Sequence, residues 1–425
     1  MPTTQEQITA VMQRIYNNGM TTLSGGNISI RNDDGSTWIT PSGVDKGTLR
    51  PEDIVLINTD GSTQGLHRPS SEYPFHLAVY AARPEIRAVV HAHPPALVAF
   101  SISRTIPDTR IMPKARDICG PVGYSAYAIP GSTALADNIG RRFAEGYNLV
   151  LMENHGIVSA GHTVQEAFER METLDFCARL TIRGNQLGNV RLLTDQQIDN
   201  ARQNQTGELP EFDHSTIDAK ERSLRRDMCV FIHRSCTRQL ATSTEGTFSA
   251  RLDENSFLIT PYGVDRAMMG ENDLVCIKDG TRERGKNPSH SVLLHRMIYE
   301  RHSDINAIIM AHPPCVLAFG VTGIPYDTKT IPETYIMLRN IPLLPFGSQF
   351  IDREKTAGLI SSKTPVVICE NDCVIVTGKN ILEAFDRLEV AEYSAQAIVN
   401  AGLVGGVKHI AEHDIAAINR TFNIS

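Results

Sequence analysis

His91-Ala92-His93-Pro94-Pro95 returns later in the chain as Met310-Ala311-His312-Pro313-Pro314, a displacement of 219 residues (310 − 91). A second stretch, Glu153-Asn154-His155-Gly156, returns as Glu370-Asn371-Asp372-Cys373. Similar landmarks in the same order over about 200 residues are far better explained by an internal duplication than by coincidence. We therefore expect two copies of one fold in a single chain.

Copy one alternates helical patterns with short strand-like runs. The runs are rich in β-branched residues and are separated by Gly, Asp and Pro turns, which predicts antiparallel neighbours joined by short loops. Helical patterns before and after the runs predict covering layers, so the expected fold class is α/β: a three-layer α/β/α domain with a central, mainly antiparallel sheet. The predicted helices cover residues 8–16, 70–80 and 164–170, and the predicted strands cover residues 27–30, 37–40, 53–57, 88–91 and 148–152.

Copy two repeats further landmarks of copy one in register. Thr260-Pro261-Tyr262-Gly263-Val264 matches residues 40–44, and Pro288-Ser289-His290-Ser291 matches residues 69–72. A polar stretch rich in Gln, Asn and Asp lies between the copies. The sequence therefore predicts a domain over 1–200, a linker over 201–222 and a second domain over 223–425.

Length and composition agree with this organisation. The chain has 425 residues, 41% hydrophobic and 21% charged, which are values of globular proteins divided into domains of ordinary size. No apolar run approaches the roughly 20 residues of a membrane span, and the start lacks the layout of a signal peptide, so a cytoplasmic protein with no membrane partner is expected. Eight scattered cysteines without a CxxC pair predict reduced thiols. The net charge of −7 argues against general nucleic-acid binding.

Three histidines of copy one form a candidate metal set. His91 and His93 lie two residues apart on a predicted strand and so share one face, and His155 is the third. Neutral imidazoles suit zinc, and three protein ligands leave a position open for substrate. In copy two the matching residues are Met, His and Asp, which should weaken metal binding greatly. The sequence thus predicts one active site and one degenerate copy.

Three loops of copy one could hold an anion. Ser24-Gly25-Gly26-Asn27 offers backbone N–H groups and an amide, and Thr40-Pro41-Ser42-Gly43 adds a hydroxyl. Ser70-Ser71 stands at a predicted helix start, where the helix dipole favours negative charge, although plain N-capping is the alternative reading. Together with the histidines, the loops favour a phosphate site.

Glu72 follows the two serines directly. A first-turn Glu is commonly stabilised by the helix dipole, but a carboxylate beside a metal could also move a proton on the substrate. His76 recurs as His295, and we interpret it as structural.

These segments, in this order and spacing, resemble the class II aldolase/adducin family and, within it, the L-fuculose-1-phosphate aldolases. The resemblance spans copy one and, with losses, copy two. It implies that one Zn²⁺ per chain, or Mn²⁺ or another divalent metal, is held by the three histidines. It implies that Glu72 is the catalytic acid/base and a ligand that substrate can displace. The implied metal ligands are His91, His93 and His155, and the implied phosphate-binding residues are Asn27, Ser42, Gly43, Ser70 and Ser71.

The resemblance implies a lyase that reversibly cleaves a sugar phosphate, first of all a ketose-1-phosphate, to dihydroxyacetone phosphate and an aldehyde. Zinc, as a Lewis acid, would stabilise the enediolate left by cleavage. A decarboxylase of an oxo sugar-acid phosphate on the same fold is the alternative, and Lys114 and Arg116 would suit its carboxylate. A metal-free, adducin-like binding or assembly protein is a further alternative. Epimerases of the family resemble the chain less, because they place Asp where Glu72 stands.

One departure from the family concerns a tyrosine that follows an Ile-Pro turn and reaches a neighbouring subunit's site. Copy one has none at residues 111–117, whereas copy two has Tyr335. Our hypothesis is that copy two supplies Tyr335 as a catalytic residue to copy one across an interface. The partner would be a second copy of this chain, so that two tandem chains form a homo-oligomeric pseudo-tetramer. The alternative is that Tyr335 only packs.

Overall fold

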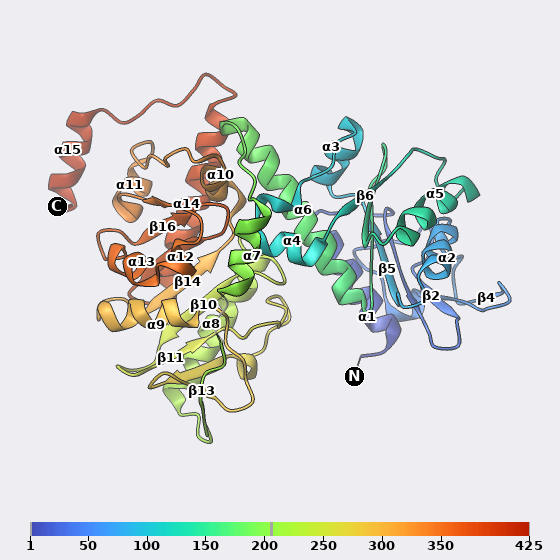
Figure 1. The fold of residues 1–425 in the computed structure, drawn as a ribbon, viewed down its shortest axis with the longest axis horizontal. Coiled ribbons are helices and arrows are strands. Elements are labelled where there is room, and N and C mark those ends of the chain that lie inside the picture. The colour runs from blue at the N-terminus through green and yellow to red at the C-terminus, as the bar shows by residue number, and fades with distance from the viewer. Residues whose placement is uncertain (1, 205–206, 425) are drawn as a thin grey trace. The chain divides into compact units, whose positions relative to one another are not determined.

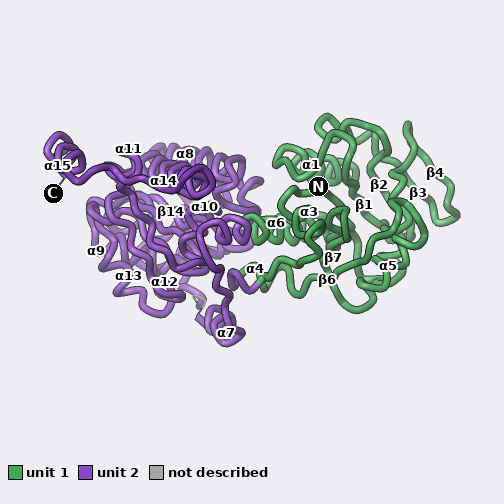
Figure 2. Tube along the Cα trace, turned by 90° about the horizontal axis from the view of Figure 1, so that it is seen from above, with its two compact units in different colours: residues 1–109, 114–179 green, residues 110–113, 180–425 purple. Residues whose placement is uncertain are grey.

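The computed structural model describes residues 2–204 and 207–424. The chain divides into two compact units, residues 1–109 with 114–179 and residues 110–113 with 180–425 (Figure 2). Each unit contains one mixed sheet with helices packed on it, so the predicted pair of α/β domains is confirmed (Figure 1).

The sheet of the first unit has the strand order β4-β3-β2-β1-β5-β8-β7-β6 in its described residues. Every neighbouring pair is antiparallel except β6 with β7. The strands are β1 (Asn27–Arg31), β2 (Thr37–Ile39), β3 (Val55–Ile57), β4 (Thr63–Gln64), β5 (Ala88–Ala92), β6 (Val122–Ser125), β7 (Leu149–Met152) and β8 (Ile157–Gly161).

Helices cover the central strands of this sheet. Buried residues of α2 and α5 form a core with side chains of β5, β7 and β8, and Arg14 of α1 pairs with Glu172 of α6 at 3.7 Å. Because strand side chains alternate between faces, His91 shares the α2 face of β5 with Val89. The helices are α1 (Thr4–Asn17), α2 (Tyr73–Ala82), α3 (Pro95–Ser103), α4 (Pro113–Cys119), α5 (Thr133–Ala144) and α6 (Val164–Leu187), with 3₁₀ turns η1 (Pro51–Asp53) and η2 (Thr109–Ile111).

The second unit repeats this arrangement. Its described residues form a sheet in the order β15-β16-β17-β14-β10-β11-β12-β13-β9, antiparallel except for the two outermost pairs. The strands are β9 (Glu211–Phe212), β10 (Thr247–Arg251), β11 (Ser256–Ile259), β12 (Val275–Lys278), β13 (Thr281–Glu283), β14 (Ala307–Ala311), β15 (Leu343–Leu344), β16 (Val366–Cys369) and β17 (Val374–Gly378). The helices are α7 (Asp195–Gln203), α8 (Ala219–Thr237), α9 (Val292–Arg301), α10 (Pro314–Thr322), α11 (Pro332–Leu338), α12 (Ser348–Ile351), α13 (Arg353–Leu359), α14 (Ile381–Ala401) and α15 (Glu412–Thr421), with η3 (Glu271–Asp273).

The compact units divide at a different place from the predicted linker at 201–222. The division falls between Arg179 and Leu180, inside α6, and the polar segment after it belongs to the second unit. Strand β9 of that segment pairs with β13, and Arg282 at the edge of the sheet pairs with Glu211 at 3.0 Å. The polar segment thus contains a short strand at the edge of the second sheet. The assignment of 1–200 and 223–425 as catalytic and degenerate domains stays a prediction.

The start of α2 also differs from the prediction. The helix begins at Tyr73, three residues after Ser70, and Glu72 is its N-cap residue without a capping side-chain hydrogen bond. Ser70 instead accepts a hydrogen bond from the Glu72 N–H at 3.3 Å. The Glu72 carboxylate is therefore free to turn toward the sheet. Among the described helices, none has the length and apolar character needed to cross a membrane.

Each unit buries one histidine between its sheet and the helix that follows β4 or β13. His76 contacts Ser29, and His295 contacts Ser249, both at 2.7 Å from ring Nδ1 to hydroxyl oxygen. Burial lowers the pKa of both imidazoles to about 3. Both histidines are therefore neutral in the folded protein at pH values where the unfolded chain binds a proton.

Acid should consequently destabilise the fold. The unfolded chain takes up protons below about pH 6.5 and the folded chain does not until about pH 3, so stability falls as pH falls through this window. We expect a loss of roughly 2 kcal/mol per histidine between pH 7 and pH 5, read from urea unfolding at both pH values. The variant His295→Asn lacks one of these groups and should lose less. Equal losses in the variant and the natural chain would contradict this account.

Candidate metal centre

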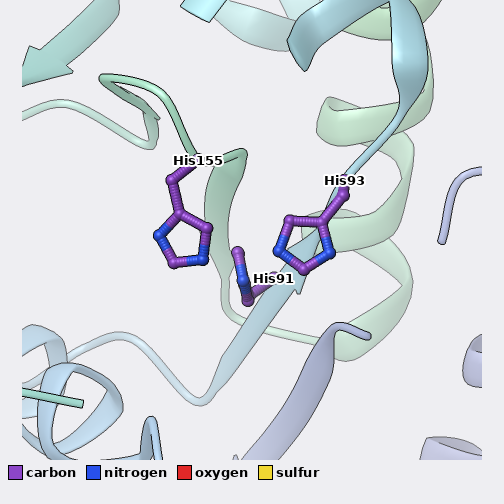
Figure 3. Close-up of side chains that lie close together, drawn as sticks. All are labelled: His91, His93 and His155. Carbon is purple, nitrogen blue, oxygen red and sulfur yellow. The ribbon is translucent and has the colours of Figure 1, made fainter. Parts of the chain in front are cut away.

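Strand pairing and a tight turn bring the three histidines together. His91 lies on β5, directly opposite Asn27 of β1 and Val158 of β8. His93 follows the strand, two residues on. His155 lies in the turn between β7 and β8, where Asn154 adopts a left-handed backbone with φ of 52°. Figure 3 shows the three rings converging from these segments.

The geometry of the rings fits a shared ion. One nitrogen of each of His91, His93 and His155 lies within 4.8 Å of the others. The ring centroids are separated by 4.6 Å for His91 and His93, 5.0 Å for His91 and His155, and 5.3 Å for His93 and His155. The predicted ligands are thus gathered at one point, although the metal itself stays a proposal.

Hydrogen bonding selects which ring nitrogen of His91 faces this point. Nδ1 donates to the Ile157 carbonyl oxygen at 2.9 Å, which leaves Nε2 with a lone pair. Nε2 is buried and has no hydrogen-bond partner among the described residues. A backbone carbonyl that holds one nitrogen so that the other can bind a metal is the usual arrangement around a histidine ligand.

Electrostatics keeps the other two histidines neutral. Burial lowers the pKa of His93 to about 3 and that of His155 to about 4, and the neighbouring His91 acts in the same direction on both. A metal binds the neutral imidazole, because protonation removes the lone pair. Both side chains are therefore ready as ligands at neutral pH.

Glu72 reaches the same point from the start of α2. Its Oε2 lies 3.3 Å from His91 Nε2, and its Oε1 lies 3.3 Å from His155 Nε2. Burial alone would raise the pKa of this carboxyl group, but His91, His155 and a hydrogen bond from Asn27 together lower it below its usual range. An ionised carboxylate and imidazole lone pairs repel at this distance unless a proton or a cation lies between them. With three imidazoles present, the residues fit a divalent cation.

Glycine is required beside the histidines because the backbone approaches them closely. A Cβ atom on Gly156 would lie 2.5 Å from the Ala92 carbonyl oxygen and 2.8 Å from His93 Cδ2. In copy two the matching residue is Cys373, which is consistent with loss of the site there.

Two of the three candidate anion loops, at residues 40–43 and 69–71, are joined to each other. Pro41 and Pro69 form a bridge, and the Ser70 N–H donates to the Thr40 carbonyl at 3.1 Å. Ser42 and Gly43 are exposed, and Gly43 has a φ of 69°. Ser71 is also exposed, whereas Ser70 and Asn27 are buried. The structure therefore brings the predicted phosphate residues to neighbouring loops.

Sequence reasoning missed Lys46, which joins two of these loops. The residue is 1% exposed, its ammonium donates to the Pro41 carbonyl at 2.7 Å, and its backbone N–H donates to the Leu23 carbonyl. Burial lowers the pKa of Lys46 to about 8. A lone lysine carries little sequence signal, since most lysines are exposed.

Tyr335 lies in the second unit, and its catalytic role stays a prediction. It belongs to α11, and its hydroxyl donates to Asn419 Oδ1 of α15 at 3.0 Å. It lines a cavity of about 540 Å³ together with basic residues, among them Arg339 and Lys363. Helices α4 and α11 begin at Pro113 and Pro332, so Arg116 is the residue of copy one that matches Tyr335.

In copy two, the residues that match the candidate site of copy one contact one another. Glu245 replaces Gly25, and its carboxylate lies 3.4 Å from His312 Nε2. Asp372, which replaces His155, is buried and accepts a hydrogen bond from Gln349. Burial and Glu245 raise the pKa of Asp372 to about 8. These contacts lie at the positions that match the candidate metal ligands of copy one.

A second group, His214, Glu221 and Cys276, also gathers three donor atoms within 4.8 Å. Here the Arg225 guanidinium already lies 2.6 Å from the Glu221 carboxylate, and burial raises the pKa of the Cys276 thiol to about 12. This group fits a metal poorly, because its carboxylate is already paired with a buried cation.

Comparison with known proteins agrees with the fold. Residues 6–182 and 226–399 match the class II aldolase and adducin N-terminal domain family. Since these two ranges make up most of the chain, it belongs to this family and contains two family domains. Class II aldolases are metal-dependent, usually with zinc.

Several characterised relatives are similar to one copy. A 5-deoxy-D-ribulose 1-phosphate aldolase of Bacillus thuringiensis is 32% identical over 46% of this chain and 92% of its own length. A 3-oxo-tetronate 4-phosphate decarboxylase of Haemophilus influenzae is 32% identical over 46% and 93%. A solved structure of an L-fuculose 1-phosphate aldolase is 28% identical, covers 47% of this chain and 94% of that chain, and has a TM-score of 0.43.

Metal content should separate the two copies. We expect about one divalent metal ion per chain, because one three-histidine set is present. The variant His93→Ala should lose it, whereas the matched variant His312→Ala in copy two should keep it. Elemental mass spectrometry on the purified proteins measures this. Equal metal content in both variants would contradict the assignment of the site.

Proposed function

We propose that copy one is a metal-dependent aldolase that reversibly cleaves a sugar phosphate. The first candidate substrate is a ketose-1-phosphate, with dihydroxyacetone phosphate and an aldehyde as products. The observation that supports this best is the position of Glu72, whose two oxygens lie 3.3 Å from His91 Nε2 and His155 Nε2. A proton-transferring carboxylate beside the candidate metal ligands is suited to chemistry at a carbon next to a carbonyl group.

His91, His93 and His155 would hold the metal, with zinc as the first candidate. Zinc bound there would supply Lewis-acid stabilisation of the negative charge that develops on the substrate oxygens. Glu72 would hold the proton that moves between the cleaved carbon and solvent. Its pKa is lowered, so it is ionised at neutral pH.

Residues Ser42, Gly43, Ser70 and Ser71 would bind the substrate phosphate. Their support is the bridge between Pro41 and Pro69, which sets the two loops side by side. The Lys46 ammonium beneath the Pro41 carbonyl would add positive charge under this anion site. Asn27 was predicted to belong to the same set, and its Nδ2 donates to Glu72 Oε2 at 2.8 Å.

A decarboxylase acting on an oxo sugar-acid phosphate is the second candidate. Copy one carries Arg116 where copy two has Tyr335, and a guanidinium is suited to a carboxylate. The aldolase and decarboxylase relatives are equally similar, at 32% identity. A non-catalytic, adducin-like binding protein is disfavoured by the intact group of Glu72 and three histidines.

Removal of the proposed base should abolish most activity. We expect Glu72→Gln to lower the cleavage rate at least about 100-fold with metal content retained, because general acid–base catalysis typically contributes this much. The assay would compare ketose-1-phosphates with oxo sugar-acid phosphates, following aldehyde and carbon dioxide as separate products. Ser291→Ala, at the matching position of copy two, serves as the control. Carbon dioxide release alone would favour the decarboxylase, and no turnover of either class would favour the binding protein.

Copy two is proposed to take part in catalysis through Tyr335. The phenol would reach the copy-one site of a second chain and protonate the leaving aldehyde's oxygen, in a homo-oligomer of two tandem chains. This would explain why copy two carries a tyrosine where copy one carries Arg116.

The hypothesis predicts a specific kinetic defect. Tyr335→Phe should lower kcat about 10-fold or more, because a proton donor is lost. Tyr393→Phe, which removes an exposed phenol of the same unit, should leave kcat unchanged. Steady-state kinetics and light scattering on the same samples would measure rate and assembly. An unchanged rate in Tyr335→Phe would mean that copy two is scaffold.

A further inference from the structure

A continuous chain of buried hydrogen bonds ends on the Glu72 carboxylate. His76 Nε2 lies 2.5 Å from Asn27 Oδ1, and Asn27 Nδ2 donates to Glu72 Oε2 at 2.8 Å. On the other side of the ring, Nδ1 lies 2.7 Å from Ser29 Oγ, which in turn lies 2.7 Å from the Tyr80 hydroxyl. None of these side chains is more than 9% exposed. The chain therefore runs from the core of the first unit to the candidate site.

The donors and acceptors of this hydrogen-bond chain can be arranged in one way. A carboxylate only accepts hydrogen bonds, so Asn27 must turn its NH₂ toward Glu72 and its oxygen toward His76. The His76 Nε2 must then carry the proton of the neutral ring. Nδ1 is left as an acceptor for the Ser29 hydroxyl, and Ser29 can accept from Tyr80. The Nδ1–H tautomer would instead leave two acceptors, His76 Nε2 and Asn27 Oδ1, facing each other at 2.5 Å.

Copy two keeps the hydrogen bonds that join its buried serine, histidine and tyrosine. It lacks those that lead from the histidine to a glutamate. Ser249 lies 2.7 Å from His295 Nδ1 and 2.7 Å from the Tyr299 hydroxyl, as in copy one. Thr247 stands in place of Asn27, and its hydroxyl bonds to Ser289 Oγ at 2.7 Å. His295 Nε2 is consequently buried without a hydrogen-bond partner among the residues that the structure describes.

The comparison separates two roles of the buried histidine. The contact of Nδ1 with serine is common to both copies and serves the fold. The donation from Nε2 occurs only in the copy that also has a glutamate to orient. Copy two tolerates an unsatisfied Nε2, so the fold does not need that hydrogen bond.

We propose that His76 is a positioning residue that acts through Asn27. Its Nε2–H holds the Asn27 oxygen, which keeps the NH₂ group pointed at Glu72 Oε2 and keeps the carboxylate aimed at His91 and His155. Asn27 then orients the catalytic base, in place of the phosphate contact predicted for its side chain. This inference rests on the proposed function, since it assigns Glu72 as the group to be oriented.

Two substitutions at His76 separate the two ring nitrogens. His76→Asn places an amide near the position of Nδ1 and removes the donor at Nε2. His76→Gln reaches the position of Nε2 and can restore an N–H toward Asn27. His295→Asn makes the same change in copy two, where Ser291 stands in place of Glu72. Thermal unfolding would show that all three variants fold and that the two Asn variants lose similar stability.

We expect His76→Asn to lower kcat about 10-fold to 100-fold, with KM for the phosphorylated substrate within about three-fold of the natural chain. His76→Gln should recover much of that loss, and His295→Asn should leave kcat unchanged. Equal kcat losses in His76→Asn and His295→Asn would overturn the proposal, as would an unchanged kcat in His76→Asn.

A second measurement does not depend on catalysis. In protein labelled with ¹⁵N-histidine, two-bond ¹H–¹⁵N spectra report which ring nitrogen carries the proton, and the His76 signals are identified by their loss in His76→Gln. The Nε2–H tautomer is expected, and the Nδ1–H tautomer would overturn the proposal. Because this result stands whether or not a substrate is turned over, failure of the positioning role and failure of the aldolase proposal are distinguishable. If His76→Asn does not fold, the proposal is tested by the kcat of His76→Gln and by the tautomer of His76 in the natural chain.

Discussion

The antiparallel pairing of β1 with β5 is the constraint on which the candidate site depends. It sets Asn27 opposite His91, and alternation along both strands turns these two side chains toward α2. Glu72 and His76 of that helix segment then meet them. A slip of one residue in the pairing would turn His91 and Asn27 to opposite faces of the sheet, so the register holds the metal ligands and the base together.

Copy two shows what the fold requires without the site. Its β10–β14 pairing keeps the same register, with Thr247 opposite Met310. The His295–Ser249–Tyr299 contacts also persist, so they belong to the shared architecture. The site itself has been replaced by groups that satisfy one another, such as Glu245 with His312 and Gln349 with Asp372. The duplication therefore provides an internal comparison between structural and functional roles of matched residues.

Much of the fold was predictable because local patterns were strong. The runs at 27–30 and 88–91 are strands β1 and β5, and the helical pattern at 164–170 lies within α6. Boundaries were less predictable. Helix α2 begins at Tyr73 and not at the predicted Ser70, and the linker predicted at 201–222, which contains β9, stays a prediction. Lys46 carried no recognisable signal, since its burial beneath the Pro41 carbonyl arises from the meeting of two loops.

The sequence by itself determined the duplication, the family and the three histidines, because these depend on residue identity and on spacing along the chain. The spacing of two residues predicted that His91 and His93 lie on one side, and in the structure His93 comes directly after the end of β5. Only the tertiary structure decided that His155 and Glu72 reach the same point, that the Ile157 carbonyl selects the free nitrogen of His91, and that Asn27 faces both His76 and Glu72. Among these contacts, the hydrogen bonds of Asn27 and His91 join residues at least 45 apart in the chain, and their distances are set by the packing of α2 and the β7–β8 turn against the sheet.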